Sequence, residues 1–129
     1  RFMQKMGASR VVLARETPIE VIQEACKTGM EIEVFVYGAI CISYSGQCLM
    51  SASLKNRSAN RGMCAQCCRL RYYQEDGSSF QGGKFLLSPK DLNVIENVPA
   101  LIEAGVSSLK IEGRMKRPEY VWLITRTFR

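Results

Sequence analysis

The hydrophobic positions of the first forty residues change their period twice. Residues 9–16 hold a short apolar run between polar flanks, which predicts a buried strand. Residues 17–28 then follow a helical period, with Thr17 as the expected N-cap and Pro18 at the first helical position. Residues 31–38 alternate charged and apolar side chains before becoming mostly apolar, which predicts a second strand. The apolar face of the helix is formed by Ile19, Ile22 and Cys26.

A similar alternation returns near residue 83. Residues 83–89 predict a strand, and Ser88 followed by Pro89 predicts the start of a short helix over about 89–95. The pattern ends with a helix from Pro99 to Gly105, a strand over 107–113 and a helix from Pro118. Strands that alternate with helices predict an α/β fold with a parallel sheet, which is either open and doubly wound or closed into a barrel.

The stretch between the two halves, residues 39–83, has no long amphipathic period. It is too long for an idle loop, so we expect it to be functional or to have structure of its own. It contains five of the six cysteines of the chain. Basic residues gather there as well, namely Lys55, Arg57, Arg61, Arg69 and Arg71. Such a cluster indicates either an RNA or DNA partner or a basic, soluble surface.

Composition narrows the class of protein. The 129 residues are 47% hydrophobic and 23% charged with a net charge of +6, which is ordinary for a globular domain. No apolar run approaches the ~18 residues that a membrane span needs, and no secretory signal opens the chain. We therefore expect a cytoplasmic protein whose cysteines are reduced. The chain lacks an initiator Met and begins in what resembles the end of a helix, so we interpret it as a piece of a longer protein.

Clustered, reduced thiols point to metal binding or redox chemistry. Thiolates select zinc, copper or iron–sulfur clusters, and four of them complete the shell of a zinc ion or of a cluster. The chain contains no histidine, which excludes a mixed Cys/His zinc site within it. A disulfide or an inert, buried thiol are the alternatives. We interpret Cys26 as a core residue because of its helix face, and Cys67 because it adjoins Cys68.

The segment EVFVYGAICISYSGQCLMS resembles the signature of the collagenase-like peptidase family of unassigned catalytic type, peptidase family U32. LARE, NRGMCAQCCR, LLSPKDL and SLKIEGRMKRPEYV are similar to further blocks of the family, in the same order. The residues that match the signature are Glu33, Phe35, Gly38, Ala39, Ile40, Cys41, Gly46, Cys48, Met50 and Ser51.

The resemblance implies that residues 1–129 form part of a parallel, TIM-like β/α barrel with the cysteine-rich segment 39–83 inserted. Some members were linked to collagen degradation. Others are iron–sulfur proteins needed for oxygen-independent hydroxylation of tRNA, ribosomal RNA or the ubiquinone precursor, with prephenate as the implied oxygen donor. The implied ligands of a four-iron, four-sulfur cluster are Cys41, Cys48, Cys64 and Cys68. The family often has His where this chain has Tyr37, and Pro where this chain has Cys67. Because Cys67 is thus an additional thiol, it is an alternative to Cys64 or Cys68 as a ligand.

Three functions follow as hypotheses. The first is an iron–sulfur enzyme that hydroxylates RNA, for which the RNA-binding candidates are Arg57, Arg61, Arg69 and Arg71. The second is a peptidase acting on collagen or another peptide, for which the carboxylate candidates are Glu16, Glu33 and Glu112. A structural ion pair of Glu112 with Lys110 or Arg114 is the competing interpretation. The third is a zinc-stabilised RNA-binding module in which Tyr72 and Tyr73 stack on bases.

Overall fold

The computed structural model describes residues 2–81, 85–113 and 116–129. The chain divides into two compact units. The first, which we call the sheet unit, comprises Arg1–Ala39 and Asp91–Arg129. The second, the cysteine unit, comprises Ile40–Lys90. None of the described helices is long and apolar enough to cross a membrane.

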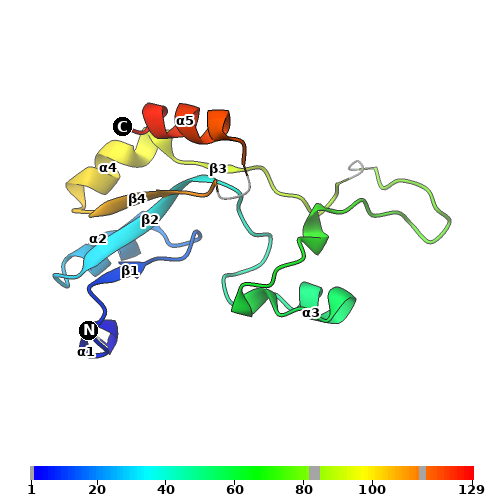
Figure 1. Cartoon of the computed structure of the whole chain (residues 1–129), viewed down its shortest axis with the longest axis horizontal. Helices are drawn as coiled ribbons and strands as arrows, with labels where there is room; N and C mark the ends of the chain where they lie inside the picture. Colours follow the sequence, from blue (N-terminus) through cyan, green and yellow to red (C-terminus); the bar gives the residue numbers. More distant parts are fainter. Residues whose placement is uncertain (1, 82–84, 114–115) are drawn as a thin grey trace. The chain divides into compact units, whose positions relative to one another are not determined.

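Strand β2 (Glu31–Gly38) is the centre of the sheet unit. It pairs in parallel with β1 (Arg10–Val12) and with β4 (Ser108–Ile111), and Figure 1 shows it between them. It also pairs in antiparallel fashion with the two-residue strand β3 (Leu92–Asn93). The parallel pairs confirm the α/β class that the alternating pattern predicts.

Alternation along β2 creates the core of the sheet unit. Ile32, Val34 and Val36 are buried on one face of the strand, where they cluster with Ile22 and Leu101. The last two residues belong to helices α2 and α4, so both helices cover this face. The helices of the unit are α1 (Phe2–Lys5), α2 (Ile19–Cys26), the 3-10 helix η3 (Ile95–Asn97), α4 (Val98–Glu103) and α5 (Pro118–Thr127).

The cysteine unit consists of short helices joined by turns. Its helices are α3 (Met50–Lys55) and the 3-10 helices η1 (Ala59–Arg61) and η2 (Cys67–Arg69). Asn56 ends α3 in the left-handed conformation, with a φ of 51°. Gln66 has a φ of 54° immediately before η2. These turns fold the chain back on itself, so that α3 contacts both η1 and η2.

The structure corrects the predictions made for residues 83–95. Phe85–Leu87 form turns rather than a strand, and Gly83 and Lys84 lie outside the described residues. No helix covers the described residues 89–94; β3 and then η3 stand in its place. Thr17 does not cap α2, because Pro18 occupies the N-cap position and no side chain donates or accepts a capping bond. The strands and helices predicted from the other periodic segments are confirmed. β2 has the predicted bounds, α4 begins one residue earlier than predicted, and the others are shorter.

Gly38 ends β2 where the backbone of β4 continues into Glu112. Its φ of +117° lies in a region that L-residues rarely adopt. A Cβ atom built on Gly38 would lie 2.5 Å from the carbonyl oxygen of Glu112 and 2.7 Å from its Cβ. The carboxyl ends of the two parallel strands therefore approach as closely as they do only because residue 38 has no side chain.

We expect Gly38→Ala to lower the free energy of unfolding by about 3 kcal/mol or more, because backbone strain and a steric clash with Glu112 add together. Gly29→Ala is a matched control. Gly29 also has a positive φ, +77°, but a Cβ there would meet no atom within 4 Å, so only the strain of about 1 kcal/mol remains. Urea denaturation measures both variants. Equal losses would contradict the close approach at Gly38.

Candidate metal centre

Five cysteines lie in the cysteine unit, and they differ in exposure. Cys41 and Cys64 are exposed, and Cys48 and Cys68 are half-buried. Cys67 is only 2% exposed, in agreement with its interpretation as a core residue. All six cysteines of the chain are unpaired thiols in the structure. The four thiols that the family resemblance assigns as ligands are thus the ones with access to solvent.

The turn around Cys64 directs polar groups at its sulfur. The backbone N–H of Gln66 donates to Cys64 Sγ at 3.3 Å, and the Ser51 hydroxyl lies 4.0 Å from the same sulfur. Ser51 is 1% exposed, and its oxygen also accepts the N–H of Ala65 at 3.1 Å. N–H donors to sulfur are one of the means by which proteins tune thiolate-bound clusters. The cysteine unit thus fixes Cys64 without help from a metal.

The pKa of the Cys68 thiol is affected by burial, by a neighbouring cation and by two other cysteines. Burial raises the pKa of the Cys68 thiol, the neighbouring Arg69 guanidinium acts in the opposite direction, and the thiols of Cys41 and Cys64 raise it further. Cys41 and Cys64, which are 27 and 4 residues away in the sequence, thus both act on the Cys68 thiol.

The donor set fits a metal or a cluster by its chemistry, because several thiols, an N–H group directed at a sulfur and an adjacent cation are present together. The thiols do not converge in the structure. Within residues 2–81, 85–113 and 116–129, no group of three or more His, Cys, Asp or Glu side chains has the proximity needed to hold a metal ion. The four assigned sulfurs would therefore have to approach one another for a four-thiolate shell to close.

The arginines of the cysteine unit have different surroundings. Arg57 and Arg61 are exposed. The Arg71 guanidinium lies over the Phe85 ring, 5.4 Å from its centroid. Arg69 donates three hydrogen bonds within the unit, to Ile40, Ser88 and Pro89. Arg57 and Arg61 are thus the most available of the four arginines for an external partner.

The carboxylate candidates lie in the sheet unit. Glu33 accepts hydrogen bonds from Lys110 Nζ at 3.0 Å and from Ser108 Oγ at 2.9 Å, and these two contacts hold the pKa of Glu33 below its usual value. Glu112 forms an ion pair with Arg15 at 2.5 Å. Arg15 also stacks on Phe35, with its guanidinium carbon 3.9 Å from the ring centroid.

The structural ion pair predicted for Glu112 is present, but with Arg15 as the partner. Of the two predicted partners, Lys110 is paired with Glu33 instead, and Arg114 lies outside the described residues. Arg15 was not among the candidate residues, because it lies 97 positions from Glu112 and no local pattern connects them. The third carboxylate, Glu16, is exposed.

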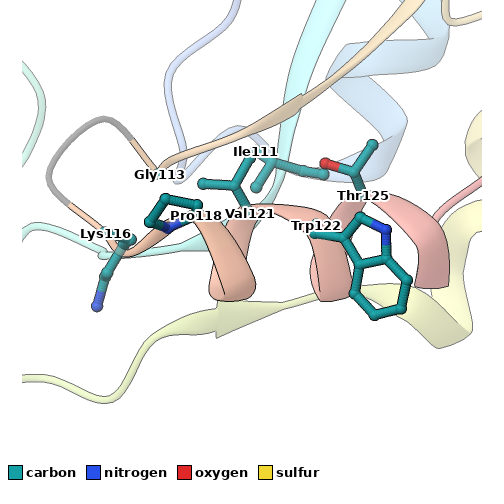
Figure 2. Close-up of a pocket in the computed structure, with 7 residues that line it drawn as sticks. All are labelled: Ile111, Gly113, Lys116, Pro118, Val121, Trp122 and Thr125. Carbon is teal, nitrogen blue, oxygen red and sulfur yellow. The ribbon is translucent and has the colours of Figure 1, made fainter.

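An open pocket of about 710 Å³ is lined by residues of α5 and of the end of β4. Figure 2 shows Pro118, Val121 and Trp122 along one side of the helix, with Ile111 of β4 beside them. Lys116 is the one charged residue among the described residues that line it. None of the candidate site residues contributes to this pocket. It is an uncovered apolar surface, and the thiol chemistry lies elsewhere.

Comparison with known proteins connects the chain to several named relatives. It is 45% identical to the tRNA hydroxylation protein P1 of Bacillus subtilis, over 100% of this chain and 33% of the relative. It is 46% identical to the 23S rRNA 5-hydroxycytidine C2501 synthase of Escherichia coli, over 100% of this chain and 20% of the relative. A collagenase of Porphyromonas gingivalis is 37% identical over 95% of this chain and 33% of its own length.

The chain thus spans a third or less of the length of these relatives. No solved structure matches it. The family model described as Peptidase family U32 matches residues 1–129. Since that match covers all 129 residues, the chain belongs to peptidase family U32.

Proposed function

We propose that the protein containing this chain is an enzyme that hydroxylates tRNA or ribosomal RNA without using molecular oxygen. The observation that carries the proposal is the identity of 45–46%, across the whole chain, to relatives named for hydroxylation of tRNA and 23S rRNA. An RNA substrate and the absence of any membrane-spanning helix among the described residues support a cytoplasmic location.

The cofactor we propose is a four-iron, four-sulfur cluster held by Cys41, Cys48, Cys64 and Cys68. The effect of Cys41 and Cys64 on the Cys68 thiol and the N–H directed at Cys64 Sγ support this assignment. When bound, such a cluster supplies one-electron redox chemistry. Zinc in the same thiolate shell, within a non-catalytic RNA-binding module, is the alternative that metal analysis distinguishes.

The charge of the cysteine unit suits an RNA partner. Ile40–Lys90 contains seven Lys and Arg but only two acidic residues, so it carries +5 of the net charge of +6. Not one Asp or Glu occurs between residues 40 and 74. Cationic side chains supply most of the affinity of proteins for phosphate backbones. We therefore assign RNA contacts to the cysteine unit, with exposed Arg57 and Arg61 as the leading contributors.

Peptidase activity is the second candidate, favoured by the relative named collagenase. The chain offers little chemistry for it. No histidine is present to activate a cysteine or serine nucleophile or to bind a catalytic zinc. Glu33 and Glu112 are each paired with a cation, and the lowered pKa of Glu33 makes it a weak base. A peptidase would need its base from a part of the protein beyond these residues.

The finer proposal for the fold is a β/α barrel of which the sheet unit is a part. Among the described strands, β4 pairs only with β2, so its other edge is open to a further strand. The apolar pocket on α5 lies beside that edge, and a right-handed crossover to a new parallel strand would cover it. An uncovered Trp122, 61% exposed, is consistent with a surface that the rest of the barrel buries.

Trp122 reports on this fold proposal because it is the single tryptophan of the chain. In the longer protein that contains the chain, we expect the Trp122 emission to be blue-shifted and protected from acrylamide, since a neighbouring strand and helix would exclude water. Replacing the other tryptophans of that protein by Phe isolates the signal. Emission at the wavelength of exposed tryptophan would contradict the barrel.

A cysteine series tests the cofactor. The protein purified without oxygen should contain about four iron and four sulfide per chain and absorb visible light. Each of four substitutions should abolish that absorbance by opening the thiolate shell: Cys41→Ala, Cys48→Ala, Cys64→Ala and Cys68→Ala. Cys26→Ala and Cys67→Ala are the controls, and should retain the cluster at a packing cost of about 1 kcal/mol.

The series also distinguishes Cys67 from Cys68 as the ligand, since the two residues are adjacent but differ in burial. Loss of absorbance in Cys67→Ala with retention in Cys68→Ala would show that the ligand is Cys67. Stoichiometric zinc without iron, after anaerobic reconstitution, would replace the cluster by the zinc alternative.

A deletion strain tests the reaction. Mass spectrometry of its tRNA and ribosomal RNA should show one hydroxylated nucleoside missing, both with and without oxygen in the culture. The wild-type gene and the Cys26→Ala gene should restore it, whereas the Cys41→Ala gene should not. Persistence of every hydroxylated nucleoside together with loss of gelatin cleavage would favour the peptidase instead.

A further inference from the structure

Arg69 makes an unusual set of contacts inside the cysteine unit. Its Nη1 donates to Ser88 Oγ and to the carbonyl oxygen of Pro89, both at 2.6 Å. Its Nη2 donates to the carbonyl oxygen of Ile40 at 2.8 Å. The side chain is half-buried, and no ion pair with a carboxylate is found for it in the part of the chain that the structure describes. The Arg69 guanidinium therefore donates hydrogen bonds to three neutral acceptors.

The three acceptors lie at the two ends of the cysteine unit. Ile40 is its first residue, and Ser88 and Pro89 come just before its last, Lys90. A single side chain thus closes a loop of about fifty residues, which is costly in chain entropy unless strong bonds compensate. Hydrogen bonds from a charged guanidinium are short and stronger than neutral ones, and the rigid fork of Arg reaches acceptors in two directions.

The sequence positions of these contacts tie two cysteines together. Arg69 directly follows Cys68, and Ile40 directly precedes Cys41. The hydrogen bond from Nη2 to the Ile40 carbonyl therefore holds the residue before Cys41 against the residue after Cys68, 29 positions further along the chain.

We propose that Arg69 is the positioning residue of the thiol site: it brings Cys41 and Cys68 together before any metal binds. The inference rests on the proposed function, because it takes the thiols as metal ligands. It assigns Arg69 a role inside the protein and removes it from the arginines that contact RNA.

Geometry and charge are separable by substitution. Arg69→Lys keeps the cation but has no planar fork, so it cannot donate to Ile40 and to the Ser88–Pro89 pair together. Arg69→Gln removes both. Ser88→Ala removes one of the three bonds and leaves the one to Ile40 intact. Arg71→Gln is the matched control, since Arg71 lies two residues away and makes none of these bonds.

The experiment titrates the metal-free protein with cobalt(II) under argon and measures the thiolate-to-cobalt charge-transfer bands, whose intensity grows with the number of thiolates bound. Wild type, Arg71→Gln and Ser88→Ala should bind with full intensity, Ser88→Ala a few-fold more weakly. Arg69→Lys and Arg69→Gln should bind at least about tenfold more weakly and with reduced intensity, because two of the thiols are no longer held together.

Two folding controls accompany the titration. Trp122 lies in the sheet unit, so its fluorescence reports whether that unit is intact in each variant. Hydrogen exchange of α3 reports on the cysteine unit at a helix that Arg69 does not contact through a hydrogen bond. A positioning role predicts that both signals are unchanged in Arg69→Lys while cobalt binding is weakened.

Cobalt binding in Arg69→Gln equal to that of wild type would overturn the proposal and leave the thiol site standing. Loss of protection throughout α3 in both Arg69 variants would overturn it too, since Arg69 would then be needed for the fold of the whole unit. A wild-type protein that binds neither cobalt nor iron would sink the proposed cofactor, and this inference with it.

Discussion

The pairing of β2 with parallel neighbours on both sides is the constraint on which the sheet unit depends. Parallel strands need crossover connections, and these bring α2 and α4 onto the face formed by Ile32, Val34 and Val36. The same arrangement places the carboxyl ends of β2 and β4 together, so closely that Gly38 has room for no side chain. Functional groups of parallel α/β folds collect at that edge. The chain enters the cysteine unit two residues after Gly38.

The sequence predicts the elements whose periodicity agrees with their packing. The alternation along β2 and the apolar face of α2 were sufficient, because β2 buries Ile32, Val34 and Val36 and the apolar face of α2 packs against the same core. Phe85–Leu87 misled the prediction, since an apolar run forms a strand only where a partner strand exists. Ser88 misled it for a different reason. Its hydroxyl accepts a hydrogen bond from Arg69, a tertiary contact, and caps no helix.

The sequence identified the candidate thiols, whereas it could not predict the contacts that surround them. Thiol type and clustering identified the cysteines, but their contacts come from residues far apart in the chain. Arg69 reaches Ile40 across 29 positions, and Arg15 reaches Glu112 across 97. Local spacing offered Lys110 as the partner of Glu112, and the structure gives Lys110 to Glu33 on the neighbouring strand. No helical or strand period encodes such pairs, because they depend on how strands are placed side by side.

These pairings bear on the choice between the two enzyme classes found in the family. A general base works best when its pKa lies near the working pH. Hydrogen bonds from Lys110 and Ser108 lower the pKa of Glu33 below the ordinary carboxylate range, which leaves it ionised and weakly basic at neutral pH. The Cys68 thiol differs, because burial raises its pKa and the neighbouring Arg69 offsets that effect only in part. Glu33 is therefore poorly suited to abstract a proton, whereas the proposed coordination by Cys68 would require that a bound metal displace the proton of a buried thiol.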